Sequence, residues 1–277
     1  MPELPVGFHF TQMRLQDYLD CRRRFQLRYL HGQPWPAHVV EPADLFEKHV
    51  EQGKQFHRLV HQYLLDFPLE SLNLLAIEPP LSRWWQSFLA HGLEGIPEAR
   101  VPETTHSTSL SGFRLVGKYD LISIGDTGNV IIVDWKTSKF VPAMSDLRSR
   151  MQSRLYPYIL ARAGLSRFGL KTIRPDQISM RYWYAEDPES PKEFSYSQEQ
   201  FGEDEQFIDA LIDEIQNLKE EIFPLTDDVK KCRYCIYRSL CDRGIQAGPI
   251  DNLETDLDIL NDWPEGIDLD QLAEIEF

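Results

Sequence analysis

Residues 129–139, NVIIVDWKTSK, decide the fold that the sequence predicts. A run of β-branched apolar residues is typical of a strand buried on both faces. Because side chains alternate between the two faces of a strand, Asp134 and Lys136 share one face with Ile132, whereas Trp135 lies on the other. We therefore expect two opposite charges to point into one space, where they meet other charged groups.

The rest of the chain predicts a mixed α/β (α+β) fold, with a mixed central sheet flanked by helices. Periodicity and turn signals give the expected elements. They are helices from residue 11 toward 21 and over 43–66, 82–91, 144–162 and 197–222, and strands over 100–110, 113–124, 129–138 and 177–185. The turn signal at 125–128 makes the second and third strands a hairpin.

Composition is that of an ordinary globular protein, with 277 residues of which 42% are hydrophobic and 26% are charged. We expect one domain over residues 1–250, with a helical N-terminal region, and a separate tail over 251–277. No segment has the pattern of a signal peptide or a membrane span. We therefore expect a cytoplasmic protein with no membrane partner.

The net charge of −15 at first argues against a nucleic-acid partner. Its distribution weakens that argument, because residues 251–277 hold ten acidic residues and no Lys or Arg, which leaves 34 acidic against 29 basic residues in 1–250. Acidic and apolar residues alternate in the tail, a pattern typical of a flexible segment that adds solubility. The alternative hypothesis is that the tail docks on a protein partner or covers a basic groove of this chain.

Two carboxylates are expected to meet near the end of the hairpin. Asp120 closes the GKYD segment, and Asp134 lies on the partner strand. Adjacent carboxylates repel each other unless a cation lies between them, and Mg²⁺ or Mn²⁺ prefers such oxygen ligands. Lys136 would then lie beside the bound water or a phosphate. Taken alone, Asp134 and Lys136 also fit a structural ion pair, and that simpler interpretation is favoured until other residues are considered.

Two helical segments carry further polar candidates. His57 and His61 are four residues apart and lie on one face of the 43–66 helix. Gln152 and Tyr156 share the same spacing beside the apolar stripe of the 144–162 helix. Each pair fits an active-site lining, and each also fits a partly buried helix.

Together these motifs resemble the RecB-like branch of the PD-(D/E)XK nuclease superfamily, over about residues 11–245. The motifs that carry the resemblance, in order, are Gly53-x-x-x-His57, GKYD with Asp120, Asp134-x-Lys136 and Gln152-x-x-x-Tyr156. The resemblance implies a restriction-endonuclease-like core and hydrolysis of phosphodiester bonds in DNA. It also implies that His57, Asp120, Asp134 and the carbonyl of Trp135 bind Mg²⁺ or Mn²⁺, with Lys136 as the catalytic lysine.

The same resemblance gives roles to neighbouring residues. Gln152 and Tyr156 would orient the lysine or the DNA backbone, and Glu103 occupies a strand position where relatives often carry an acid. Two departures are visible: Lys118 stands where relatives commonly have Arg, and Pro157 follows Tyr156 directly. Proline tends to kink a helix, and such a kink would change the direction in which the Tyr156 side chain points.

Four cysteines form the last pattern. Cys232, Cys235 and Cys241 have the spacing C-x2-C-x5-C, and Cys21 lies near the N-terminus. Thiols of an intracellular protein bind soft metals more often than they form disulfides, and from spacing alone zinc or an iron–sulfur cluster would serve. The arrangement resembles the 4Fe–4S cluster of AddB-type nucleases, CRISPR-adaptation nucleases and exonuclease V. Such a cluster would join the two ends of the domain.

The sequence thus predicts a Mg²⁺- or Mn²⁺-dependent deoxyribonuclease with a structural 4Fe–4S cluster. The resemblance favours an exonuclease on single-stranded DNA or DNA ends, in repair, recombination or CRISPR adaptation. The alternative is a catalytically idle DNA-binding or scaffold subunit of a nuclease–helicase or adaptation complex.

Overall fold

The computed structural model describes residues 4–34, 40–219 and 221–249. The acidic segment 251–277, for which the sequence predicts a flexible or partner-docking tail, lies outside the described residues. Across the described ranges, no helix combines the length and apolar character needed to cross a bilayer.

Six strands in the described part of the chain form one mixed sheet, in the order β1-β4-β5-β6-β7, with β3 also paired to β4. The strands are β1 (His9–Thr11), β3 (Ala99–Leu110), β4 (Phe113–Ile124), β5 (Val130–Lys136), β6 (Ile178–Tyr184) and β7 (Asp187–Ser195). Pairs β1–β4 and β5–β6 are parallel, whereas β3–β4, β4–β5 and β6–β7 are antiparallel. The predicted mixed sheet is confirmed. Strands β2 (Val40–Glu41) and β8 (Gly248–Pro249) form a separate parallel pair.

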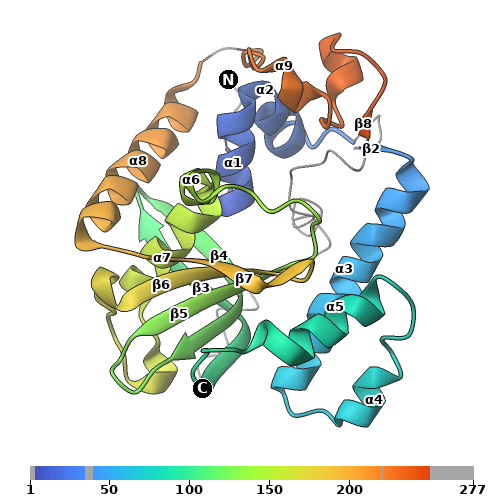
Figure 1. The fold of residues 1–277 in the computed structure, drawn as a ribbon. Coiled ribbons are helices and arrows are strands. Elements are labelled where there is room, and N and C mark those ends of the chain that lie inside the picture. The colour runs from blue at the N-terminus through green and yellow to red at the C-terminus, as the bar shows by residue number, and fades with distance from the viewer. Residues whose placement is uncertain (1–3, 35–39, 220, 250–277) are drawn as a thin grey trace.

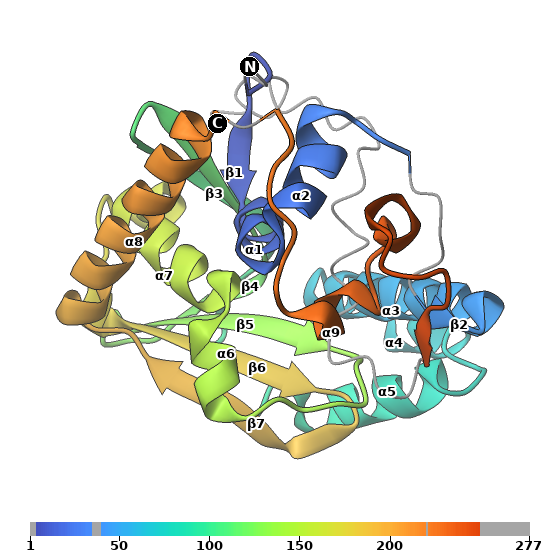
Figure 2. The same cartoon turned by 90° about the horizontal axis from the view of Figure 1, so that it is seen from above.

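Helices cover both faces of the sheet (Figures 1 and 2). The α-helices are α1 (Gln12–Asp20), α2 (Arg22–Phe25), α3 (Ala43–Leu64), α4 (Leu69–Asn73), α5 (Leu81–Ser87), α6 (Met144–Ser149), α7 (Met151–Ala163), α8 (Gln198–Asn217) and α9 (Val229–Cys232). Shorter helical turns are η1 (Gln26–Leu30), η2 (Phe88–Gly92), η3 (Ser166–Phe168), η4 (Pro175–Gln177) and η5 (Arg238–Cys241). One core cluster joins α1, α7 and α8 to the sheet, and a second joins α3, α5 and η2 to its other face.

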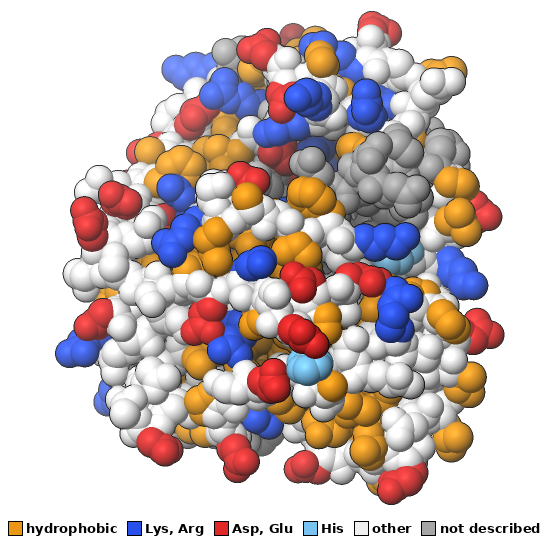
Figure 3. Space-filling model, in the orientation of Figure 1, with side chains coloured by type: hydrophobic (Ala, Val, Ile, Leu, Met, Phe, Trp, Pro, Cys, Tyr) orange, Lys and Arg blue, Asp and Glu red, His pale blue; other side chains and the backbone are white. Residues whose placement is uncertain are grey.

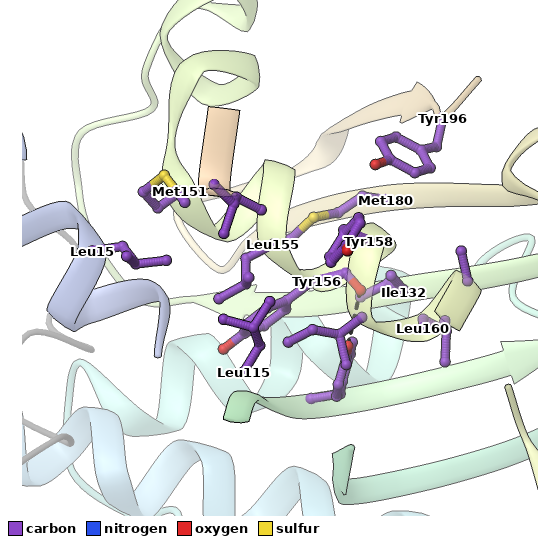
Figure 4. Close-up of a cluster of buried hydrophobic side chains, with 14 of the residues drawn as sticks. Leu15, Leu115, Ile132, Met151, Leu155, Tyr156, Tyr158, Leu160, Met180 and Tyr196 are labelled. Atoms are coloured by element: carbon purple, nitrogen blue, oxygen red, sulfur yellow. Dashed lines mark hydrogen bonds between the residues drawn. The ribbon is translucent and has the colours of Figure 1, made fainter. Parts of the chain in front are cut away.

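Strand β5 lies between the two cores, as its apolar run predicts. All seven of its residues are buried. Ile132 belongs to the core beneath α7, which Figure 4 shows, whereas Val133 and Trp135 belong to the core beneath α3 and α5. Because successive side chains enter different cores, a shift of one residue in register would exchange the two sets.

The hairpin predicted between β4 and β5 is confirmed, but the sequence did not predict β1 or β7. β7 lies at the end of the strand order and contains Pro188 and Pro191 among charged residues. Proline cannot donate to a ladder, so it is tolerated mainly in edge strands, and its presence conceals such a strand from a pattern search.

The helix expected over 144–162 is in fact two helices, because the chain is extended at Arg150 (ψ 144°). Gln16 on α1 accounts for the new helix start: its side-chain oxygen accepts a hydrogen bond from the N–H of Met151 at 3.1 Å. The first N–H groups of a helix lack partners within it, so a neighbouring helix can fix where α7 begins. The break is therefore set by a tertiary contact.

Replacing Ile132 by Ala should destabilise the protein by about 2–5 kcal/mol, because the side chain is fully buried and a cavity would remain. The matched control is Ile77→Ala, at a side chain that is 71% exposed, for which a change within about 0.5 kcal/mol is expected. Urea denaturation followed by circular dichroism measures both. Equal midpoints for the two variants would contradict the placement of β5 in the core.

Candidate active site and cysteine cavity

Three polar side chains from separate elements form a group that can hold a metal ion. They are His57 on α3, Glu103 on β3 and Asp120 on β4, and one ligand atom from each lies within 4.8 Å of the other two. All three are partly buried. An imidazole nitrogen with two carboxylate oxygens suits a hard divalent ion, and three such ligands leave positions for water.

The register of β3 and β4 places Glu103 opposite Asp120. The flanking pairs are Pro102 with Leu121 and Thr104 with Tyr119, and no ladder pair joins the two acids themselves. Glu103 has a φ of 45°, a left-handed conformation that is uncommon for a residue other than glycine within a strand. Backbone strain of this kind is concentrated at functional sites, where the surrounding structure maintains it.

Asp120 is held by groups on two sides. Its Oδ2 lies 3.5 Å from His57 Nδ1 and accepts a hydrogen bond of 2.9 Å from the backbone N–H of Trp135. Burial by itself would raise the pKa of Asp120. The charge and hydrogen bond of His57, the Trp135 N–H and the charge of Lys136 outweigh burial and lower that pKa below its ordinary value. The carboxylate is therefore ionised and ready to bind a cation.

Asp134, Lys136 and Gln152 form a second, buried polar group. Lys136 Nζ lies 2.6 Å from Asp134 Oδ2 and donates to Gln152 Oε1 at 3.4 Å, and Gln152 Nε2 donates to Asp134 Oδ1 at 2.6 Å. Each of the three residues is at most 5% exposed. Buried charges are stable only when paired and hydrogen-bonded, a condition that this group satisfies.

The structure thus divides the residues predicted for the site into two neighbouring groups. Asp134 follows the last β4–β5 ladder pair, Leu121 with Val133, so its position is opposite Asp120, but its side chain contacts Lys136. The metal-binding group contains Glu103 where the sequence predicted Asp134. A role for Asp134 as a metal ligand stays a prediction, as does that of the Trp135 carbonyl.

Tyr156 lies on α7, which continues through Pro157 to its end. Its ring packs against Tyr119 with 4.7 Å between the centroids, and its carbonyl accepts a 2.9 Å hydrogen bond from the Tyr119 hydroxyl. Tyr119 directly precedes Asp120 on β4, so these contacts place Tyr156 behind the strand that carries the carboxylate. A role in orienting Lys136 stays a prediction.

The position of Glu103 could have been read from the sequence through the turn between β3 and β4. Ser111 and Gly112 have φ of 50° and 79°, and Leu110 pairs with Phe113. A two-residue hairpin with two positive φ angles fixes the register of both strands. Counting back from the turn in a Leu-Ser-Gly-Phe segment gives Glu103 opposite Asp120.

The four cysteines line one cavity. Cys21, between α1 and α2, meets Cys232, Cys235 and Cys241 from the C-terminal segment. Burial raises the pKa of the three C-terminal thiols, that of Cys235 to about 11. Deprotonation of these thiols would therefore accompany metal binding.

Basic side chains surround the thiols. The same cavity is lined by Arg24, Lys231, Arg238 and Arg243. Lys and Arg side chains are visible on the upper part of the molecule in Figure 3, where α2 and α9 lie in Figure 1. Positive charges of this kind stabilise an anionic thiolate–metal group.

Polar contacts join residues 20–26 to residues 221–231, the two segments that carry the cysteines or flank them. Gln26 donates to the Glu221 carbonyl at 2.8 Å and accepts from the Phe223 N–H at 2.9 Å. Lys231 lies 2.8 Å from Asp20, one residue before Cys21. The cysteines therefore lie where contacts between distant segments already converge.

The family model that matches this chain is described as the PD-(D/E)XK nuclease superfamily, and it covers residues 9–242. No curated protein matches the sequence. Among solved structures, SSO0001 is 14% identical with a TM-score of 0.41, over 86% of this chain and 88% of its own. The "putative exonuclease" of Eubacterium rectale is 8% identical with a TM-score of 0.46, over 75% of this chain and 79% of its own. Likenesses this distant carry no argument about function.

Replacing Glu103 by Gln should weaken Mn²⁺ binding about tenfold or more, because the amide keeps the shape of the side chain and removes one ligand charge. Isothermal titration calorimetry without DNA measures the affinity. Glu98→Gln, at an exposed acid just before β3, is the matched control. Unchanged affinity in both variants would remove Glu103 from the metal group.

Proposed function

Because the chain belongs to the PD-(D/E)XK nuclease superfamily, we propose that it is a metal-dependent nuclease that hydrolyses phosphodiester bonds of DNA. The observation that carries this proposal is the His57, Glu103 and Asp120 group, whose ligand atoms lie within 4.8 Å of one another. The charge of the buried Lys136 also acts on Asp120. Divalent ions are the cofactors that such a ligand set suits, and Mg²⁺ or Mn²⁺ is the proposed ion.

The residues gathered at the site have separate parts in the proposed mechanism. A bound divalent ion would supply Lewis acidity for the hydrolysis. His57, Glu103 and Asp120 would hold that ion, and the Trp135 N–H fixes the direction of the Asp120 carboxylate. Lys136 provides positive charge for the oxygen that becomes negative during hydrolysis.

Gln152 is proposed to position both members of the Asp134–Lys136 pair. Its amide nitrogen donates to one carboxylate oxygen while its amide oxygen accepts from the ammonium group. An amide can satisfy both partners at once because it carries a donor and an acceptor at fixed separation. Asp134 is the proposed additional metal ligand, and its contact with Lys136 supplies balancing charge until an ion binds.

We further propose membership of the RecB-like branch, with an exonuclease activity on single-stranded DNA or DNA ends. The order of the motifs from His57 to Tyr156 supports this assignment. Repair, recombination and CRISPR adaptation are the processes in which such an activity would act. Residues 1–250 are proposed to form one nuclease domain, in the cytoplasm, with the acidic tail as a site for a protein partner.

The cysteine cavity is proposed to hold a 4Fe–4S cluster through Cys21, Cys232, Cys235 and Cys241. Zinc is the alternative, and it would hold four sulfurs about 4 Å apart, given Zn–S bonds of about 2.3 Å. All four cysteines line this one cavity, which supports a site that uses all four thiolates as ligands.

A second candidate function is a catalytically idle DNA-binding or scaffold subunit. The observation that favours it is the short Asp134–Lys136 ion pair, because a purely structural pair would have the same geometry. The strained Glu103 and its neighbours count against this candidate, since a scaffold has no use for a gathered metal-binding group.

Wild-type protein should degrade labelled single-stranded DNA with Mn²⁺ or Mg²⁺ and be inactive in EDTA. Lys136→Ala and Asp120→Ala should each lower the rate about 100-fold or more. Lys171→Ala, at an exposed lysine, should retain full activity. Substrates blocked at one end or the other report polarity. Equal activity in all four proteins would implicate a contaminant and favour the scaffold.

Protein purified without oxygen should contain about four iron and four acid-labile sulfide per chain and be brown. Cys235→Ser should lose both and unfold at a lower temperature, since metal binding stabilises the fold. A colourless protein with stoichiometric zinc would refute the cluster.

A further inference from the structure

Two exposed residues, Lys139 and Phe140, project from the loop that follows β5. The Phe140 side chain is 42% exposed, although Ser138 before it and Pro142 after it are buried. Ser138 Oγ donates to the Phe140 carbonyl at 3.2 Å, and Val141 packs against the core beneath α7. The loop is therefore anchored on both sides of an aromatic ring that faces solvent.

The ring lies close along the chain to Lys136 of the candidate active site. It follows Lys136 by four residues, a distance of at most about 14 Å along the chain. Burial and the charge of Lys139 lower the pKa of His49, which places Lys139 near α3, two turns before His57. Figures 1 and 2 agree that the segment joining β5 to α6 runs between the sheet and α3.

Building on the nuclease function proposed above, we propose that Phe140 stacks on an unpaired base of the DNA strand that enters the site. The ring would select single-stranded over duplex DNA, because stacking requires a base whose face is not covered by a neighbouring base pair. Lys139 lies beside the ring, where its charge attracts the backbone of the same strand. Because the loop is anchored on both sides of the exposed ring, little conformational entropy is lost when DNA binds.

A single exposed aromatic residue is common on protein surfaces, and Phe140 differs from others by its position four residues after Lys136. Phe168 provides the comparison within this chain. It is 39% exposed, but it lies in η3, shortly before the start of β6. Strand β6 is parallel to β5, so Phe168 is at the end of the sheet opposite Lys136.

The test uses the full chain in EDTA, which prevents cleavage, with a fluorescent oligothymidylate and a blunt duplex of equal length. Phe140→Ala should weaken binding to the single strand about 5- to 100-fold and change duplex binding less than about twofold. Phe140→Trp should restore single-strand affinity, and Phe168→Ala should match wild type. Thermal unfolding of each variant confirms that the fold is retained.

A second measurement identifies the base that stacks. Single abasic positions are moved along the oligonucleotide, and removal of the stacked base should weaken wild type but not Phe140→Ala, because both changes remove one interaction. Additive losses at every position would overturn the stacking assignment.

The outcomes separate this inference from the nuclease function. If wild type cleaves DNA with Mn²⁺ but Phe140→Ala binds the single strand as wild type does, only the stacking proposal is overturned. Equal losses on single strand and blunt duplex would overturn the preference for an unpaired base. If wild type neither binds nor cleaves DNA, the nuclease function fails, and the role of Phe140 fails with it.

Discussion

The hydrogen bond from the Trp135 N–H to the Asp120 carboxylate is the contact on which the candidate site depends. Strands β4 and β5 pair up to Leu121 and Val133, and beyond that point a side chain takes the place of the ladder partner. A buried N–H needs an acceptor, and here the Asp120 carboxylate accepts from the Trp135 N–H. This one hydrogen bond therefore fixes both the distance between β4 and β5 at this point and the direction of the carboxylate. This interruption of the ladder lies between the metal-binding group, which includes Asp120, and the buried group of Asp134 and Lys136. The Trp135 N–H, between Asp134 and Lys136 in the chain, links the two groups.

The sequence was sufficient for most of the fold and for part of the site. Alternation along β5 correctly assigns its side chains to two different cores, and helical spacing leads to Gln152. The edge strand β7 was missed because prolines and charges obscure its pattern. Likewise, the helix break at Arg150 depends on Gln16, 135 residues from its bonding partner, and local periodicity does not contain that contact.

The distinction between Glu103 and Asp134 shows the same limit at the site. Both acids occupy positions facing Asp120, one across β3 and the other across β5. Which one approaches His57 is decided by the backbone angle of Glu103 and by the lysine that pairs with Asp134. The order of residue types predicts the register of the strands. It does not predict which of several nearby charged groups each carboxylate will contact.

The backbone at Glu103 also has a consequence for how this chain can change. Glycine adopts positive φ without the steric cost that a side chain incurs, so substitution by glycine would relax β3 while deleting a carboxylate. Relief of this steric cost would favour glycine here, whereas the proposed metal binding and the 2.9 Å ion pair with Lys118 favour glutamate. At position 103, therefore, relief of backbone strain and metal binding favour different residues.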